Sequence, residues 1–168
     1  MGTPQDEVDR IVAAWHRERP DLPTLPLSVF SRITRLARHL DRARRAAFAQ
    51  HHLEVWEFDV LTALRRAGEP YQLTPGVLMN QTMVSSGTMT NRIDRLVVHG
   101  LVVRTAHPAD RRVVQVRLTK EGMATVDAAM SDLLRIEADA LKTLPPTEQT
   151  HLADLLRHLL VQFESPGA

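Results

Sequence analysis

The sequence predicts a mainly α-helical fold that carries one small β-hairpin. Two observations lead to this fold class. Apolar residues recur at steps of three and four over most of the chain, which is the period of an amphipathic helix. Between residues 101 and 118 the period changes to two, and the turn-forming stretch His107-Pro108-Ala109-Asp110 divides that segment as a hairpin loop would.

The composition is that of one ordinary globular domain. The chain has 168 residues and 43% of them are hydrophobic, which is enough to bury a core. No apolar run is long enough to cross a membrane and no signal-peptide core is visible, so we expect a cytoplasmic protein without a membrane partner. The absence of cysteine excludes disulfides and cysteine-based metal sites. The formal net charge is only +1, so an argument for nucleic acid depends on where the arginines lie.

Two N-terminal helices are expected on either side of a proline-rich break. Residues 5–17 have apolar side chains spaced for one helical face, and the three prolines of residues 20–26 end that helix. A longer helix with an apolar stripe follows over residues 28–50. Its other side carries five arginines: Arg32, Arg35, Arg38, Arg42 and Arg45. This arginine face is either a solvated surface or a set of phosphate contacts.

The helix expected over residues 54–66 is almost entirely apolar and should be a central packing element. Asp59 lies inside that apolar run, and a buried carboxylate is costly unless it is paired or hydrogen-bonded. Asp59 therefore either holds an arginine or a helix end in place, or lines a ligand pocket.

Two shorter helices are expected over residues 75–80 and 86–99, joined by a turn at 81–84. Thr74 before Pro75 is typical of a helix start, with the threonine as N-cap. Ser85 and Ser86 are both suitable N-caps for the second helix, and Gly100 stands where a C-terminal glycine belongs.

The second of these helices has a core side and a polar side. The core side is formed by Met89, Ile93, Leu96 and Val97. The polar side presents hydroxyls, an amide and an arginine, which hydrogen-bond base edges and phosphates in a major groove. The candidate DNA contacts are Ser85, Ser86, Thr88, Thr90, Asn91 and Arg95. Arg92 lies at the border of the two sides, where it either reaches DNA or leans back under the helix.

A hairpin with a basic tip follows, with strands expected over residues 101–106 and 112–118. Arg111 and Arg112 at the tip suit insertion into a minor groove. The alternative is a polar tip in which Asp110 pairs with an arginine internally. Together with the two preceding helices, the hairpin makes residues 53–119 a winged helix-turn-helix, a unit that reads duplex DNA.

The C-terminal part should pair two copies of the chain. Thr119 is expected to cap a helix that runs to about residue 141, and Leu144-Pro145-Pro146 separates it from a last helix ending near residue 163. The winged unit is too small to cover the apolar faces of residues 1–50 and 120–168, so we expect these to be dimerisation helices of a two-fold homodimer. Such a dimer binds a pseudo-palindromic operator with half-sites about one helical turn apart.

This layout resembles the MarR family of transcriptional regulators, with residues 1–168 as a single MarR-type domain. The resemblance is carried by Asp110-Arg111-Arg112, Leu118-Thr119 and Gly122, together with residues 92–96 and 100–102. It implies a homodimeric repressor of transcription that a small ligand releases from double-stranded DNA. It also implies that Ser86, Thr88, Asn91 and Arg95 face the groove and that Arg112 enters the minor groove.

A narrower resemblance is to the urate-responsive (PecS-, HucR- and TamR-like) branch of that family. It is carried by the N-terminal extension with Trp15 and by Arg19-Pro20-Asp21. That branch implies a ligand pocket made by Trp15, Asp59, Arg92 and Arg104, which favours the pocket role for Asp59. The implied effector is a small anion, either urate- or purine-like or citrate- or aconitate-like.

Other function classes have weaker support. None of the eight histidines has the spacing of a zinc-protease motif, and no glycine-rich phosphate loop is present, so we expect no enzyme, no metal site and no cofactor. The rival interpretation is a helical adaptor that binds only protein. An adaptor would not need the Arg111-Arg112 tip or the face with Asn91 and Arg95.

Overall fold

The computed structural model describes residues 5–106 and 113–164, which form seven helices and a three-stranded sheet. The helices are α1 (Glu7–Glu18), α2 (Leu25–Ala49), α3 (Val55–Arg66), α4 (Pro75–Thr82), α5 (Ser86–Val98), α6 (Lys120–Leu141) and α7 (Pro146–Glu164). The strands are β1 (Gln72–Leu73), β2 (Val102–Ala106) and β3 (Val114–Leu118). The predicted class, mainly α with a small β-hairpin wing, is confirmed. The expected turn at residues 107–110, with Arg111 and Arg112, lies outside the described residues.

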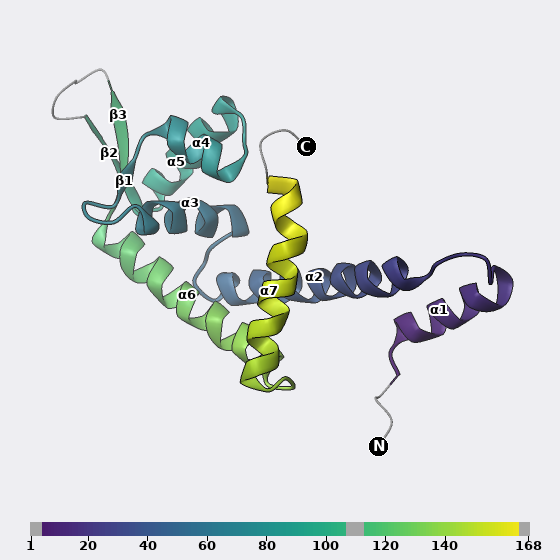
Figure 1. The fold of residues 1–168 in the computed structure, drawn as a ribbon. Helices are drawn as coiled ribbons and strands as arrows, with labels where there is room; N and C mark the ends of the chain where they lie inside the picture. Colours follow the sequence, from purple (N-terminus) through teal and green to yellow (C-terminus); the bar gives the residue numbers. More distant parts are fainter. Residues whose placement is uncertain (1–4, 107–112, 165–168) are drawn as a thin grey trace.

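The winged unit lies at one end of a framework of long helices (Figure 1). α3 packs against α6, and α2 packs against both of them. α4 and α5 form the helix-turn-helix and contact α3 and β2. α1 folds back on the far end of α2, away from the winged unit, as Figure 1 shows.

The sheet is antiparallel with the strand order β1-β3-β2. β2 and β3 pair antiparallel from Val102 opposite Leu118 to Ala106 opposite Val114, so the two predicted strands are present and are neighbours in the sheet. β1 was not predicted from the sequence. It has only two residues, and a period of two cannot be recognised over so short a segment.

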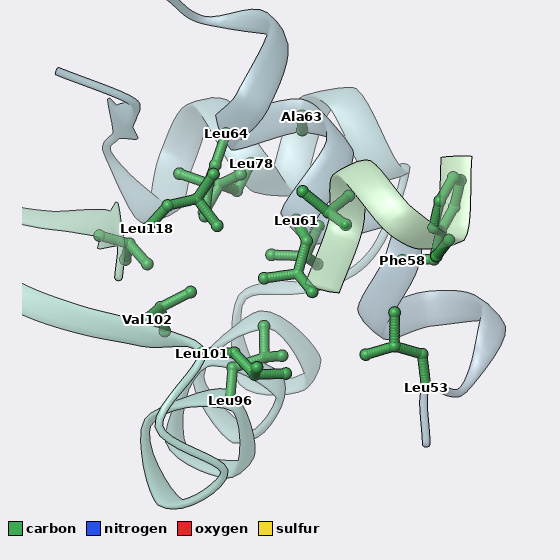
Figure 2. Packing of buried hydrophobic residues seen from close by; sticks show 14 of the residues in the cluster. Leu53, Phe58, Leu61, Ala63, Leu64, Leu78, Leu96, Leu101, Val102 and Leu118 are labelled. Carbon is green, nitrogen blue, oxygen red and sulfur yellow. The ribbon is translucent and has the colours of Figure 1, made fainter. Parts of the chain in front are cut away.

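The core is centred on α3, as predicted. Figure 2 shows its leucines meeting side chains from the helix-turn-helix and from the sheet. The most completely buried large side chains include Phe48, Leu61, Leu64, Leu78, Met89, Ile93, Leu96, Val102 and Val116. Because one face of α5 is anchored in this core, its opposite face is left to solvent in a fixed orientation.

Three predicted N-caps are confirmed. The hydroxyls of Thr74, Ser85 and Thr119 accept hydrogen bonds from the backbone N–H three residues further on, at 3.3, 3.4 and 2.9 Å. Gly100 follows α5 with a φ of +72°, a left-handed conformation that favours glycine.

Three expectations were wrong in detail. α2 begins at Leu25 rather than near residue 28, because Pro26 fits into the first turn, where no backbone N–H is needed. Val97 is partly exposed rather than a core residue. Asp59 is not buried, since 46% of its side chain is exposed.

Candidate nucleic-acid interface

The polar face of α5 is exposed and faces away from the core. The six candidate side chains all lie on exposed positions: Ser85, Ser86, Thr88, Thr90, Asn91 and Arg95. The hydroxyls of Ser85 and Thr88 are 2.9 Å apart, and the Thr90 hydroxyl donates to the Ser86 carbonyl at 3.0 Å. These bonds hold the hydroxyls close to the N-terminal turns of the helix, where backbone N–H groups and the helix dipole favour an anion such as phosphate.

A shallow hollow of about 490 Å³ lies over this face. It is lined by Trp56, Gly87, Thr88, Asn91, Arg92 and Arg95. The hollow therefore contains hydrogen-bond donors, two cations and an aromatic ring beside the exposed start of the helix.

Arg95 is held by two residues at the start of α3. Its guanidinium forms an ion pair with Glu54 and lies over the Trp56 ring, 4.8 Å from the ring centroid. The Trp56 indole N–H donates to the same Glu54 carboxylate at 2.7 Å. The hydrogen bond from Arg95, followed by that from Trp56, lowers the pKa of Glu54 below its ordinary value.

Arg92 is half-buried at the border of the two sides of α5, as predicted. Its guanidinium lies 5.3 Å from the centroid of the same Trp56 ring. Arg92 leans back toward α3, and together with Trp56 it lines two neighbouring hollows.

The second hollow, of about 480 Å³, contains two of the four ligand candidates. Asp59 and Arg92 line it together with Arg45, Leu53, Glu54, Val55 and Trp56. Asp59 also lies 3.5 Å from a guanidinium nitrogen of Arg44, so it both holds an arginine and borders a cavity. The two roles considered for Asp59 are therefore compatible in this structure.

Arg104 and Trp15 lie elsewhere in the chain. Arg104, on β2, forms an ion pair with Asp94 of α5 at 2.6 Å. This ion pair connects the wing to the exposed side of α5. Trp15 lines a hollow of about 350 Å³ on α1, with Ile11, Ala14 and Glu18. Within one chain the structure therefore brings Asp59 and Arg92 to a common hollow, but not Trp15 or Arg104.

The buried carboxylate of α3 is Glu57, which the sequence analysis did not single out. Only 1% of Glu57 is exposed. It accepts from the backbone N–H of Glu54 at 2.9 Å and shares a hydrogen bond of 2.9 Å with Nδ1 of His99, the C-cap of α5. A hydrogen-bonded partner is what a buried carboxylate requires, and here it ties the end of α5 to the start of α3.

The arginine face of α2 is partly paired within the chain. Arg32 binds Asp6 and Asp9 ahead of and within α1, and Arg45 binds Asp41. Arg35, Arg38, His39, Asp41 and Arg42 line an open hollow of about 490 Å³. The pairing of Arg32 and Arg45 agrees with a solvated face, and phosphate contact by the other arginines stays a prediction.

Two features of the described residues concern other function classes. In the described ranges no group of three or more His, Cys, Asp or Glu side chains could hold a metal ion. None of the described helices combines the length and the apolar character that crossing a membrane requires.

Comparison with known proteins agrees with the geometry. A family profile described as MarR family matches residues 52–113. The chain is 38% identical over 150 residues to the HTH-type transcriptional regulator PecS of Dickeya dadantii, covering 89% of this chain and 90% of that protein.

Solved structures of regulators have the same fold. A variant of Escherichia coli MarR complexed with operator DNA superposes with a TM-score of 0.66 at 28% identity, covering 83% of this chain and 99% of that one. Bordetella bronchiseptica BpsR, whose DNA binding is regulated by 6-hydroxynicotinic acid, superposes with a TM-score of 0.59 at 28% identity, covering 80% and 94%. The chain belongs to the MarR family of transcriptional regulators.

Proposed function

We propose that this regulator is a homodimeric repressor that binds a pseudo-palindromic operator and is released by a small anion. The exposed polar face of α5 carries the proposal, because it presents hydroxyls, an amide and an arginine on a helix fixed in the core. In this assignment Ser85, Ser86, Thr88, Thr90, Asn91 and Arg95 contact the major groove, and Arg111 and Arg112 contact the minor groove. The regulator acts where the DNA is, in the cytoplasm.

Dimerisation is supported by the surfaces that the single chain leaves uncovered. α7 has 19 residues and none of them is buried, although one side of the helix is apolar. A second copy packed on this side gives the assembly two recognition helices, the number that a two-fold operator requires.

The effector site is proposed at the hollow beside Asp59 and Arg92, with contributions from Arg104 and Trp15. An anion that binds Arg104 competes with Asp94 of α5, so its binding changes a contact of the recognition helix. Because α1, which includes Trp15, packs on the end of α2 far from the winged unit, the part of Trp15 in this pocket requires α1 of the second copy. The effector releases DNA only if it binds the released state more tightly than the DNA-bound state. Urate- or purine-like and citrate- or aconitate-like anions are the two candidate classes.

The DNA-binding face is tested with Arg95→Ala. The probe is a duplex selected from a random library by the wild-type protein, and the readout is fluorescence anisotropy at fixed salt. We expect binding to weaken about fivefold or more, since one good arginine contact to DNA contributes about 1–3 kcal/mol. Arg17→Ala, which removes an exposed arginine of α1, is the matched charge control. Unchanged affinity of the Arg95 variant means that the groove face is misassigned.

The effector site is tested by release of the same duplex with urate, xanthine and citrate. Wild type should release DNA with at least one of these anions, and Arg104→Ala should need a higher concentration of it. If both proteins release DNA at the same effector concentration, Arg104 does not belong to the pocket.

A further inference from the structure

The DNA-facing arginine of α5 already has an anionic partner within the chain. Glu54 precedes the first turn of α3 and forms an ion pair with Arg95, 41 residues away in the sequence. Trp56, two residues after Glu54, supports both partners: its ring lies under the guanidinium, and its N–H donates to the carboxylate. The three side chains thus form a closed cluster, defined here as the Glu54–Trp56–Arg95 latch.

The latch lies on the surface that DNA must reach. Trp56 and Arg95 line the hollow over α5 together with Thr88 and Asn91. The side chains of Glu54 and Arg95 are 56% and 46% exposed, so neither is buried against a competing ligand. A DNA phosphate or guanine edge offers Arg95 the same kind of acceptor that the Glu54 carboxylate does.

The Arg95 guanidinium cannot donate its hydrogen bonds fully to Glu54 and to DNA at the same time. A guanidinium that donates to a phosphate or a base must turn its donors away from the carboxylate, and a carboxylate left beside the phosphates is repelled by them. Exposed ion pairs are weak, so such a latch opens readily and reduces affinity without preventing binding.

We propose that Glu54 is an internal competitor for Arg95, holding the recognition arginine against Trp56 until DNA replaces the carboxylate. The inference rests on the proposed function, in that Arg95 contacts DNA. It adds a regulatory role for Glu54 and Trp56, which lie on α3 or at its start and not on the recognition helix. Operator affinity is then set below the value that the DNA-contacting groups alone would give.

The decisive experiment is a double-mutant cycle on the full chain with the duplex selected by the wild-type protein. The variants are Glu54→Gln, Arg95→Ala and the double variant, with Kd measured by anisotropy at fixed pH and salt. Glu54→Gln should tighten binding about two- to fivefold, the range expected for loss of a surface ion pair. In the Arg95→Ala background the same substitution should give no such gain.

Controls separate the latch from general charge and from folding. Glu148→Gln removes one exposed carboxylate of α7 and should leave Kd within about twofold of wild type. Trp56→Phe keeps an aromatic ring under Arg95 but removes the donor to Glu54, so it should give a smaller gain that also depends on Arg95. Thermal unfolding of each variant identifies loss of structure.

The outcomes distinguish failure of the latch from failure of the proposed DNA contact by Arg95. If Arg95→Ala leaves Kd unchanged, the groove face is wrong and the latch has no role. If Arg95→Ala weakens binding but neither Glu54→Gln nor Trp56→Phe tightens it, the groove face stands and the latch is overturned. An equal gain from Glu54→Gln with and without Arg95 also overturns it, because the effect is then long-range charge alone.

Discussion

Thr119 and Gly122 form the junction between the wing and α6. The Thr119 hydroxyl donates to the Gly100 carbonyl at 2.8 Å and accepts from the Gly122 N–H at 2.9 Å. A Cβ on Gly122 would overlap the Leu101 carbonyl group, whose carbon lies 2.9 Å from the position of that atom. Glycine is therefore required here by the close approach of two backbone segments. This contact explains why a glycine stands at position 122 in the motif formed by Leu118-Thr119 and Gly122.

Gly122→Ala should destabilise the fold, because the new methyl group meets backbone and not a movable side chain. Overpacking of this kind costs about 1–3 kcal/mol in the free energy of unfolding, measured by chemical denaturation. Gly87→Ala is the matched control, since a Cβ there meets nothing within 4 Å. Alanine at that helical position should be stabilising by up to about 1 kcal/mol. Equal stability of the two variants would contradict the proposed contact.

Three carboxylates at the start of α3 have three different environments. Glu54 pairs with Arg95, Glu57 is buried with His99, and Asp59 lies beside Arg44 on the surface. The sequence drew attention to Asp59 because it interrupts an apolar run. The partner of Glu57 lies 42 residues away and that of Glu54 lies 41 residues away. No local pattern reports such distant pairings, so the burial of Glu57 and the pairing of Glu54 could not be predicted.

The pKa of Glu54 provides a pH test of its pairing. Arg95 and Trp56 lower this pKa from an ordinary value of 4.5, so the stabilisation from the pair is fully present above that value and is lost as the pH falls through the depressed folded pKa. Carbon-13 NMR titration of the Glu54 carboxyl in the free protein should show the lowered pKa. In Arg95→Ala it should rise toward the ordinary value, whereas Arg17→Ala should leave it unchanged. An identical titration in all three proteins would contradict the pairing.

At the scale of the elements, α1 is an attachment to α2. Val8 is its one buried residue, and hydrogen bonds to α2 and to the segment before it add to this packing. The Arg32 guanidinium of α2 donates to Asp6 at 2.8 and 3.1 Å and to Asp9 at 2.7 Å. The Thr24 hydroxyl and the His16 ring share a further hydrogen bond of 2.7 Å. An element held by so few contacts should open more readily than the core helices.

Arg32→Gln should loosen α1 without disturbing the winged unit. Removing the guanidinium leaves Asp6 and Asp9 without their common partner, so amide hydrogen exchange in residues 7–18 should become faster. Exchange in α5 should stay as in the wild type. The control is Arg35→Gln, because Arg35 makes no ion pair with any other residue that the structure describes. Unchanged exchange in residues 7–18 would show that Arg32 does not hold α1.

The elements were more predictable than the site, for a physical reason. Helix ends follow from local chemistry, so Thr74, Ser85 and Thr119 were recognised as N-caps from their neighbours alone. The start of α2 was misjudged because a proline is compatible with both a break and a first helical turn. The latch depends on packing between α3 and α5, which only the folded chain determines.

At the scale of the whole molecule, the winged unit is complete in one chain and the helical framework is not. The buried core is concentrated around α3, α5, β2, β3 and the part of α6 that packs on them. In contrast, large apolar side chains of α2 and α7 are exposed, among them Leu25, Phe30, Leu36, Leu155, Leu160 and Phe163. Large apolar side chains exposed in such number along two helices are typical of an association site. In the proposed dimer, the apolar sides of α2 and α7 that are exposed in the single chain are covered by the second copy.

If α7 lies in the dimer interface, a charge placed on its apolar side should prevent dimerisation. Leu160 on α7 is 54% exposed in the single chain, so Leu160→Glu removes no core contact and should leave thermal unfolding of the winged unit intact. In a dimer the carboxylate would be desolvated against apolar side chains, which is strongly unfavourable, so analytical ultracentrifugation should show a monomer. The monomer should lose operator affinity more than tenfold, because one recognition helix reaches only one half-site. Val98→Glu, which charges a still more exposed apolar position on α5, should keep the mass of the wild type. If both variants have wild-type mass, α7 lies outside the interface and the apolar stripe of α2 must supply it.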